Sequence, residues 1–189
     1  MNSMLKQEQA LSDALLKPKS VALVGISDDV SKTAGRPLHF LRNAGYKGTV
    51  YCVNPRRETV QGEKAYPSLS ELPEVPEHVY VLTGADLALK AVEECGKLGV
   101  PVVTLIASGF SEAGSEGIER ENKLRELKSK YQTRILGPSS LGLVNLHEDL
   151  FLTANAAFAE PGLLKGNIFC ASHSGSMIGS LTSRGRNHH

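Results

Sequence analysis

Few residues in this sequence could build a metal centre or a disulfide framework. It has no tryptophan and only three cysteines, which are Cys52, Cys95 and Cys170. The cysteines lie far apart and lack a CxxC spacing, so we expect structural thiols in a reduced protein. Upstream of the C-terminal pair, the histidines are His39, His78, His147 and His173, and none forms an HxxxH pair. We therefore expect no metal site.

An excess of charge is missing as well. The chain carries 21 basic and 20 acidic residues, so its overall charge predicts neither nucleic acid nor an anionic membrane as a partner. Any anion site must be local. No apolar run approaches the roughly 20 residues of a membrane span, and the first residues are too polar for a secretory signal. We expect a cytoplasmic protein.

Short apolar runs rich in β-branched residues alternate with stretches of helical spacing. Strands are expected at 20–25, 48–54, 78–83, 100–107 and 133–137. Helices are expected at 36–43, 87–98 and 115–130, with Gly45 and Gly99 where helices should end. Continuous apolar strands separated by helices are typical of a parallel sheet covered on both faces. The predicted fold class is α/β, a Rossmann-like parallel sheet with helices on both faces.

The chain divides into five expected segments. An N-terminal helical extension (1–18) precedes the Rossmann-like domain (19–150), and a linker (151–165) contains the stretch AEPGLLKGN. Residues 166–186 are expected to begin a second, flavodoxin-like domain, with a strand over NIFCAS and a helix starting in SGSMIGS. Residues 187–189 are expected to be the remnant of a purification tag.

The loop after the first expected strand, VGISDDVSKTAGRP, is rich in groups that bind anions. Between Gly25 and Gly35 it offers backbone amides, hydroxyls and the cation of Lys32, at the start of a helix whose N-terminus favours anions. The loop lacks the GxGxxG pattern typical of NAD sites, and it lacks the Walker pattern GxxxxGK[ST]. The alternative is a polar connecting loop without a ligand.

The second expected strand ends in VNPRR. NAD-binding Rossmann domains usually place an acid here for the ribose hydroxyls, whereas an arginine accommodates a ribose phosphate. Arg56 and Arg57 stand where that acid would be. Because a guanidinium binds phosphate in a bidentate manner, the position favours a phosphorylated ribose, as in CoA or NADP. The alternative for one of the two arginines is a solvated basic turn.

Three further strand ends carry small or polar residues, in LTGAD, ASGFSEAG and GPSSLGLVN. Ligands in open α/β sheets bind outside the carboxyl ends of the strands, so we expect these ends to share one rim with Gly25. The expected cofactor-binding residues are Gly25, Ile26, Ser27, Lys32, Asn54, Pro55, Arg56, Arg57, Thr83, Gly84, Ser108, Gly109, Pro138 and Ser139.

Taken together, these stretches resemble the CoA-binding domain of NDP-forming acyl-CoA synthetases, the superfamily that includes the succinyl-CoA synthetase α subunit. The resemblance runs from about Lys19 to Arg184, through VALVGIS, GYKGTVYCVNPR, AYPSLSELP, ECGKLGVPVVTLIASGFSEAG, RILGPSSLGLVN and GNIFCASHSGSM. It departs from the family at Ser139 and Ser140, where asparagine and cysteine usually follow GlyPro, and at LTGAD, where a proline is common. Both departures concern the thioester end of the pocket.

The resemblance also implies a role for the segment SHSGS. In the family, the matching loop opens a helix that receives a phosphate from a phosphohistidine, so Ser172, Ser174 and Gly175 are expected at that helix start. His173 lies inside this receiving loop, whereas the family's phosphohistidine lies well downstream, so we expect no catalytic residue in this chain.

The resemblance implies a ligase that makes an acyl-CoA from a carboxylic acid, CoA and ATP with Mg²⁺, through an acyl phosphate and a phosphohistidine. The expected partners are CoA, a small carboxylic acid and an ATP-grasp domain or subunit, in an oligomer, without nucleic acid or membrane. The chain alone is expected to be inactive. Two alternatives stay open: a regulatory module of a protein lysine acetyltransferase, and a non-catalytic sensor of CoA or NADP.

Overall fold

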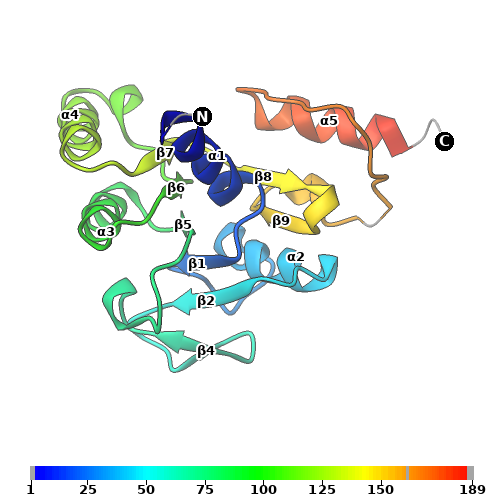
Figure 1. Cartoon of the computed structure of the whole chain (residues 1–189), viewed down its shortest axis with the longest axis horizontal. Coiled ribbons are helices and arrows are strands. Elements are labelled where there is room, and N and C mark those ends of the chain that lie inside the picture. Colours follow the sequence, from blue (N-terminus) through cyan, green and yellow to red (C-terminus); the bar gives the residue numbers. More distant parts are fainter. Residues whose placement is uncertain (1–2, 161, 187–189) are drawn as a thin grey trace.

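The computed structural model describes residues 3–160 and 162–186, and the expected tag remnant at 187–189 lies outside them. Seven strands form one sheet in the order β3-β4-β2-β1-β5-β6-β7, parallel except for β3 (Figure 1). Their bounds are β1 Ser20–Val24, β2 Thr49–Val53, β3 Thr59–Val60, β4 Glu63–Tyr66, β5 His78–Val81, β6 Val102–Leu105 and β7 Arg134–Leu136. The predicted α/β class with a Rossmann-like parallel sheet is confirmed.

Helices cover both faces of this sheet. Helices α3 (Ala85–Leu98) and α4 (Ser115–Lys130) pack on one face, and α2 (Arg36–Ala44) lies on the other (Figure 1). The hairpin of β8 (Gly142–Asn145) and β9 (Leu150–Thr153) packs beside α2. Gly45 and Gly99 end α2 and α3 in the left-handed conformation, with φ of 80° and 77°, as predicted.

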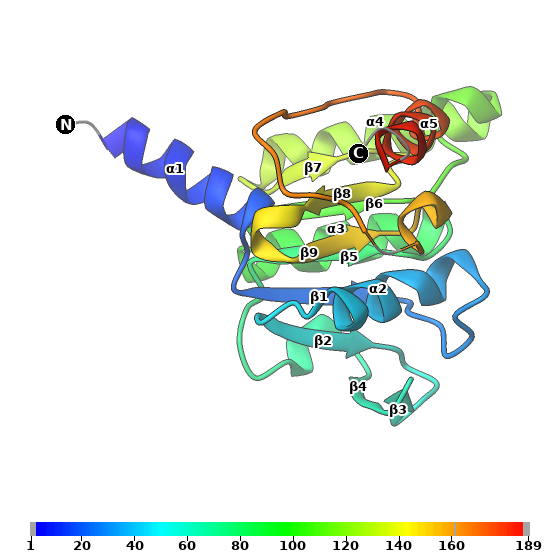
Figure 2. The same cartoon turned by 90° about the vertical axis from the view of Figure 1, so that its right-hand side faces the viewer.

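Two helices lie outside the three layers. Helix α1 (Ser3–Leu16) projects from the amino-terminal end of β1, away from the loop that follows β1 (Figure 2). Helix α5 (Gly175–Arg186) lies against η5 (Ala156–Phe158), a short 3-10 turn after β9. None of the helices in the described ranges is long and apolar enough to cross a bilayer.

Apolar side chains fill the space on each side of the sheet. Val79, Val81 and Val103 pack under α3 and α4, whereas Leu23 and Tyr80 pack under α2. All five are fully buried, as expected for strands covered on both faces. The buried strands hold their carboxyl ends at one edge of the sheet, and the loops at that edge carry the candidate site.

Parts of the C-terminal third differ from expectation. The linker expected at 151–165 begins inside β9, whose Leu150 and Leu152 are buried against α2. The strand expected over NIFCAS does not form: residues 167–172 are irregular, and Ile168 and Phe169 are 94% and 79% exposed. A strand needs a hydrogen-bonding neighbour, and no strand in the described residues pairs with this segment.

The three cysteines differ in their burial. Cys52 and Cys95 are fully buried, and burial raises the pKa of both thiols, that of Cys52 to about 12. Both are structural residues, as expected. Cys170 lies in the irregular segment and is exposed, unlike the structural thiol that was expected at this position.

Candidate functional site

The site is centred where the strand order reverses. The chain passes from β1 outward to β2 and then returns to β5 on the other side of β1, which makes the β1/β5 boundary a topological switch point. Gly25 follows β1 with φ of +80°, and its would-be Cβ would overlap Thr83 Cγ2 in the loop after β5. Only glycine fits this position, so the two loops approach closely where such folds bind ligands.

The β1–α2 loop (residues 25–35) folds back on itself. The Ser27 amide donates to the Ala34 carbonyl at 3.1 Å, and the Gly35 amide donates to Lys32 at 2.9 Å. The amides of Ile26, Asp28 and Val30 make no hydrogen bond within the described ranges. Helix α2 begins at the end of this loop without a side-chain cap. Unpaired amides beside an uncapped helix start are suited to an anion.

Lys32 adds a cation to this loop. Its side chain is 70% exposed, and its only ion pair in the described part of the chain is a loose one with Asp29 at 3.8 Å. Asp29 is held chiefly by Ser31, whose hydroxyl donates to it at 2.6 Å and lowers the pKa of the carboxyl. An exposed pair of this kind contributes little to stability, so Lys32 can exchange Asp29 for a phosphate at small cost.

The two arginines that follow β2 differ in their contacts. Arg57 donates to Asp28 of the β1–α2 loop at 3.3 Å, so its charge already has a partner. The Arg56 side chain makes no hydrogen bond or ion pair within the described residues, and only its backbone amide is held, by Asn54 at 2.9 Å. Asn54 also donates to the Ile26 carbonyl at 3.0 Å, which ties the two loops together. Pro55, which lies between Asn54 and Arg56 in the sequence, is exposed.

The loop after β5 presents an unsatisfied hydroxyl. Thr83 Oγ1 is buried and has no hydrogen-bond partner within the described residues. Gly84 then precedes α3, which starts without a side-chain cap, like α2. An unpaired buried hydroxyl costs free energy unless a ligand or water satisfies it. Thr83 and Gly84 therefore lie next to the β1–α2 loop, across the switch point, with a polar group that a ligand could satisfy.

The loop after β6 is more self-contained. The Gly109 amide donates to Glu112 at 2.6 Å, which lowers the pKa of that carboxyl, and the Gly109 carbonyl accepts from Arg120 at 3.2 Å. Both backbone groups of Gly109 are thus used within the fold. Ser108 is exposed, and its hydroxyl makes no hydrogen bond within the described residues.

The loop after β7 connects the rim to the C-terminal segment. Ser139, with φ of +57°, donates its amide to the Ala107 carbonyl at 2.9 Å, which holds Pro138 and Ser139 beside the β6 end. The next residues lead to Leu141, which contacts Gly175 at the start of α5. The expected strand ends therefore lie along one edge, in the order of the sheet.

Comparison with known proteins agrees with this geometry. The family model described as "CoA binding domain" matches residues 19–145, which is most of the chain. The chain belongs to the CoA-binding domain family. The matched range covers the whole seven-stranded sheet with its β1–α2 loop and Arg56.

The relatives of this CoA-binding domain are longer proteins that are named as ligases or ligase subunits. The chain is 37% identical to the ADP-forming acetate–CoA ligase I of Archaeoglobus fulgidus, over 88% of the chain and 23% of that protein. It is 36% identical to the alpha subunit of the ADP-forming acetate–CoA ligase II of Pyrococcus furiosus, over 87% and 35%. The chain therefore spans about a quarter to a third of the curated relatives it matches.

A solved structure has the same fold over nearly the whole chain. The dinucleotide-forming acetyl-coenzyme A synthetase 1 of Candidatus Korarchaeum cryptofilum, in complex with phosphate and ADP, superposes with a TM-score of 0.83 at 32% identity. The match covers 93% of this chain and 36% of that one.

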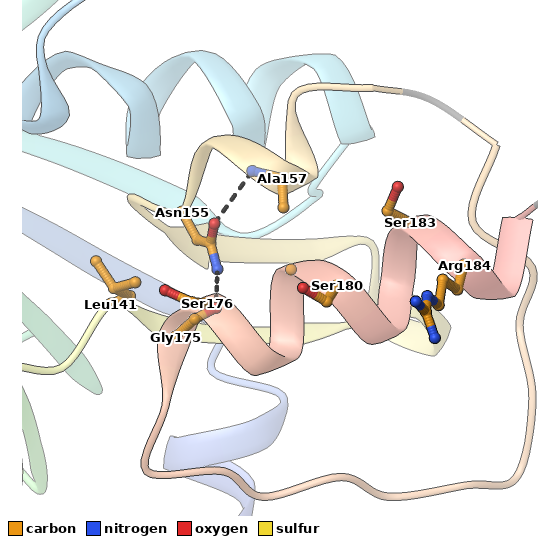
Figure 3. Close-up of a pocket in the computed structure, with 9 residues that line it drawn as sticks. Leu141, Asn155, Ala157, Gly175, Ser176, Ser180, Ser183 and Arg184 are labelled. Carbon is orange, nitrogen blue, oxygen red and sulfur yellow. Dashed lines mark hydrogen bonds between the residues drawn. The ribbon is translucent and has the colours of Figure 1, made fainter.

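The start of α5 combines a capped helix with unpaired amides. Ser174 Oγ accepts from the Met177 amide at 3.2 Å, and Ser172 Oγ accepts from the Ser174 amide at 3.1 Å. Both hydroxyls thus serve as helix-start acceptors. The amides of Gly175 and Ser176 have no partner within the described ranges. They border an open pocket of about 490 Å³ between α5 and η5 (Figure 3).

Several residues that shape the site carried no signal in the sequence. Asp28 and Gln61 link the β1–α2 loop to the β3–β4 hairpin, and Asn155 donates to the Gly175 carbonyl at 3.1 Å (Figure 3). Arg36 holds the Ser31 and Ala154 carbonyls at 3.2 Å each. Apart from the bond between Arg36 and Ser31, these contacts join segments far apart in the sequence, so no local pattern reveals them.

Proposed function

We propose that this domain binds CoA across the carboxyl ends of β1, β2 and β5. The observation that carries the proposal is the unpaired Arg56 beside a loop with unpaired amides, within a chain of the CoA-binding domain family. CoA has a diphosphate and a ribose 3′-phosphate, so it needs two anion sites. The β1–α2 loop with Lys32 would take the diphosphate, and Arg56 the 3′-phosphate.

The role of this domain in a larger protein follows from its relatives. We infer that it is the CoA-binding part of an NDP-forming acid–CoA ligase. In such an enzyme the acid and the nucleoside triphosphate would give an acyl phosphate through the phosphorylated histidine. The CoA thiolate would attack the acyl carbonyl and expel phosphate, so that acyl-CoA, NDP and phosphate leave. Mg²⁺, the nucleotide and the histidine would belong to other parts of the protein.

The start of α5 is proposed as the place where this enzyme receives a phosphoryl group. Two unpaired amides, of Gly175 and Ser176, support this role, and the helix start favours negative charge. Ser172 already donates its hydroxyl proton to the Ser174 carbonyl at 3.1 Å, so the hydroxyl that could donate to a phosphate is that of Ser174, which makes no donor bond within the described residues.

Calorimetry with four ligands tests the CoA proposal. The chain should bind CoA more tightly than dephospho-CoA, and it should not bind NAD, because no acid stands at the end of β2 for the ribose hydroxyls. NADP is the informative competitor, because its ribose phosphate could also use Arg56. Tighter binding of NADP than of CoA would favour a sensor of NADP and contradict the proposed function.

An activity assay tests the proposed division of labour. The purified chain with ATP, Mg²⁺, CoA and a panel of carboxylic acids should form no acyl-CoA. Acid-dependent release of ADP by this chain alone would show that the nucleotide chemistry does not need the remaining two thirds to three quarters of the ligases that it matches.

A further inference from the structure

The tip of the β3–β4 hairpin holds a residue in an unusual conformation. Val60 pairs with Glu63, so Gln61 and Gly62 form a two-residue turn with φ of 50° and 83°. Positive φ at both positions is typical of a type I′ turn, for which Asn-Gly is strongly favoured. Glutamine gains nothing from this conformation locally, and backbone strain of this kind often accompanies a function.

The Gln61 side chain reaches into the β1–α2 loop. Its amide nitrogen donates to the Ser27 carbonyl at 2.8 Å and to the Gly35 carbonyl at 2.9 Å. These two carbonyls lie near the two ends of the loop. One side-chain amide therefore fixes the separation of the loop's ends, and asparagine, one methylene shorter, would not reach both.

Two further contacts join the same segments. The Gln61 backbone amide donates to Asp28 Oδ1 at 2.6 Å, and Arg57 donates to Asp28 Oδ2 at 3.3 Å. Asp28 is thus bound by Arg57, which precedes β3, and by Gln61, which follows it. Its own amide is one of those left unpaired in the loop.

We propose that Gln61 is a positioning residue for CoA: it holds the two ends of the β1–α2 loop together, in the shape that directs the loop's free amides at the diphosphate. The inference rests on the proposed function, because it names that loop as the diphosphate site. Within the described residues, the hydrogen bonds of the Gln61 side chain go to the carbonyls of Ser27 and Gly35, so the residue would act through these two positions of the loop. A loop already in its bound shape loses less conformational entropy when the ligand binds, so the residue would raise affinity.

The variant Gln61→Asn separates positioning from folding. Asparagine suits the turn better than glutamine, and this gain offsets part of the stability lost with the side-chain hydrogen bonds, so the variant should fold with a thermal midpoint within about 8 °C of the wild type. The dissociation constants for CoA and dephospho-CoA should both rise roughly tenfold, as expected for loss of one or two hydrogen bonds. Their ratio should not change, because it depends on Arg56. The matched control, Gln132→Asn, makes the same change at an exposed position and should bind like the wild type.

Hydrogen exchange of the free chain provides a reading that does not depend on CoA. The hydrogen-bonded amides of the loop, those of Ser27, Lys32 and Gly35, should exchange faster in Gln61→Asn than in the wild type, while those of β1 and β5 stay protected. Wild-type affinity for CoA in Gln61→Asn, or unchanged exchange in the loop, would overturn the inference. A changed ratio of CoA to dephospho-CoA affinity would also overturn it, because Gln61 would then act at the 3′-phosphate. If the wild type itself fails to bind CoA, the proposed function fails instead.

Discussion

Replacing Arg56 tests how the domain recognises the 3′-phosphate of CoA. Arg56 is exposed at the end of β2 and makes no side-chain contact within the described residues, so Arg56→Ala should leave the fold intact. A charge-assisted hydrogen bond to a phosphate contributes about 1.5 to 3 kcal/mol. The variant should therefore bind CoA roughly tenfold to a hundredfold more weakly. Binding of dephospho-CoA should not change.

Arg57→Ala is the matched comparison. Arg57 is paired with Asp28 at 3.3 Å, so its loss should affect CoA and dephospho-CoA alike, through the β1–α2 loop. Calorimetry at fixed ionic strength measures both ratios, and the salt must be stated because exposed charges are screened. Equal binding of CoA and dephospho-CoA by the wild type would refute the assignment of the 3′-phosphate. So would a variant Arg56→Ala that still prefers CoA.

Two other predictions concern the fold. Burial lowers the pKa of His78 to about 4 from about 6.5 when unfolded. As the pH falls from 6.5 to 4, the unfolded state therefore binds the proton before the folded state does. The free energy of unfolding, measured with urea, should fall by about 3 kcal/mol over this range, and a His78→Gln variant should lack this fall. A pH-independent difference between the two would contradict this. For the thiols, a maleimide should label Cys170 at once and Cys52 and Cys95 only after unfolding, and early labelling of either buried thiol would refute the described packing.

The sheet could be predicted because burial on both faces forces its strands to be apolar. The strands around Val21, Val79 and Val103 have no polar alternation, and Gly45 and Gly99 end the helices between them. The β3–β4 hairpin could not be predicted from the sequence, because its strands are short and its turn, Gln61-Gly62, lacks the favoured Asn-Gly pair. The segment NIFCAS has the composition of a strand, but composition cannot supply the neighbour that a strand needs.

The candidate site could be predicted only as a set of strand ends. The carboxyl ends of parallel strands meet at one edge, so Gly25, Arg56 and Thr83 were expected together without knowledge of the contacts. The sequence could not distinguish Arg56 from Arg57, because the partner of Arg57 is Asp28, which lies 29 positions away. Nor could it show that Thr83 has an unpaired hydroxyl, which depends on what surrounds it.

The most direct measurement is a structure of this chain with CoA bound. We expect the diphosphate at the amides of the β1–α2 loop, close to Lys32, and the 3′-phosphate within hydrogen-bond distance of the Arg56 guanidinium. CoA bound with its phosphates away from the carboxyl ends of β1 and β2, for example along α4, would contradict it.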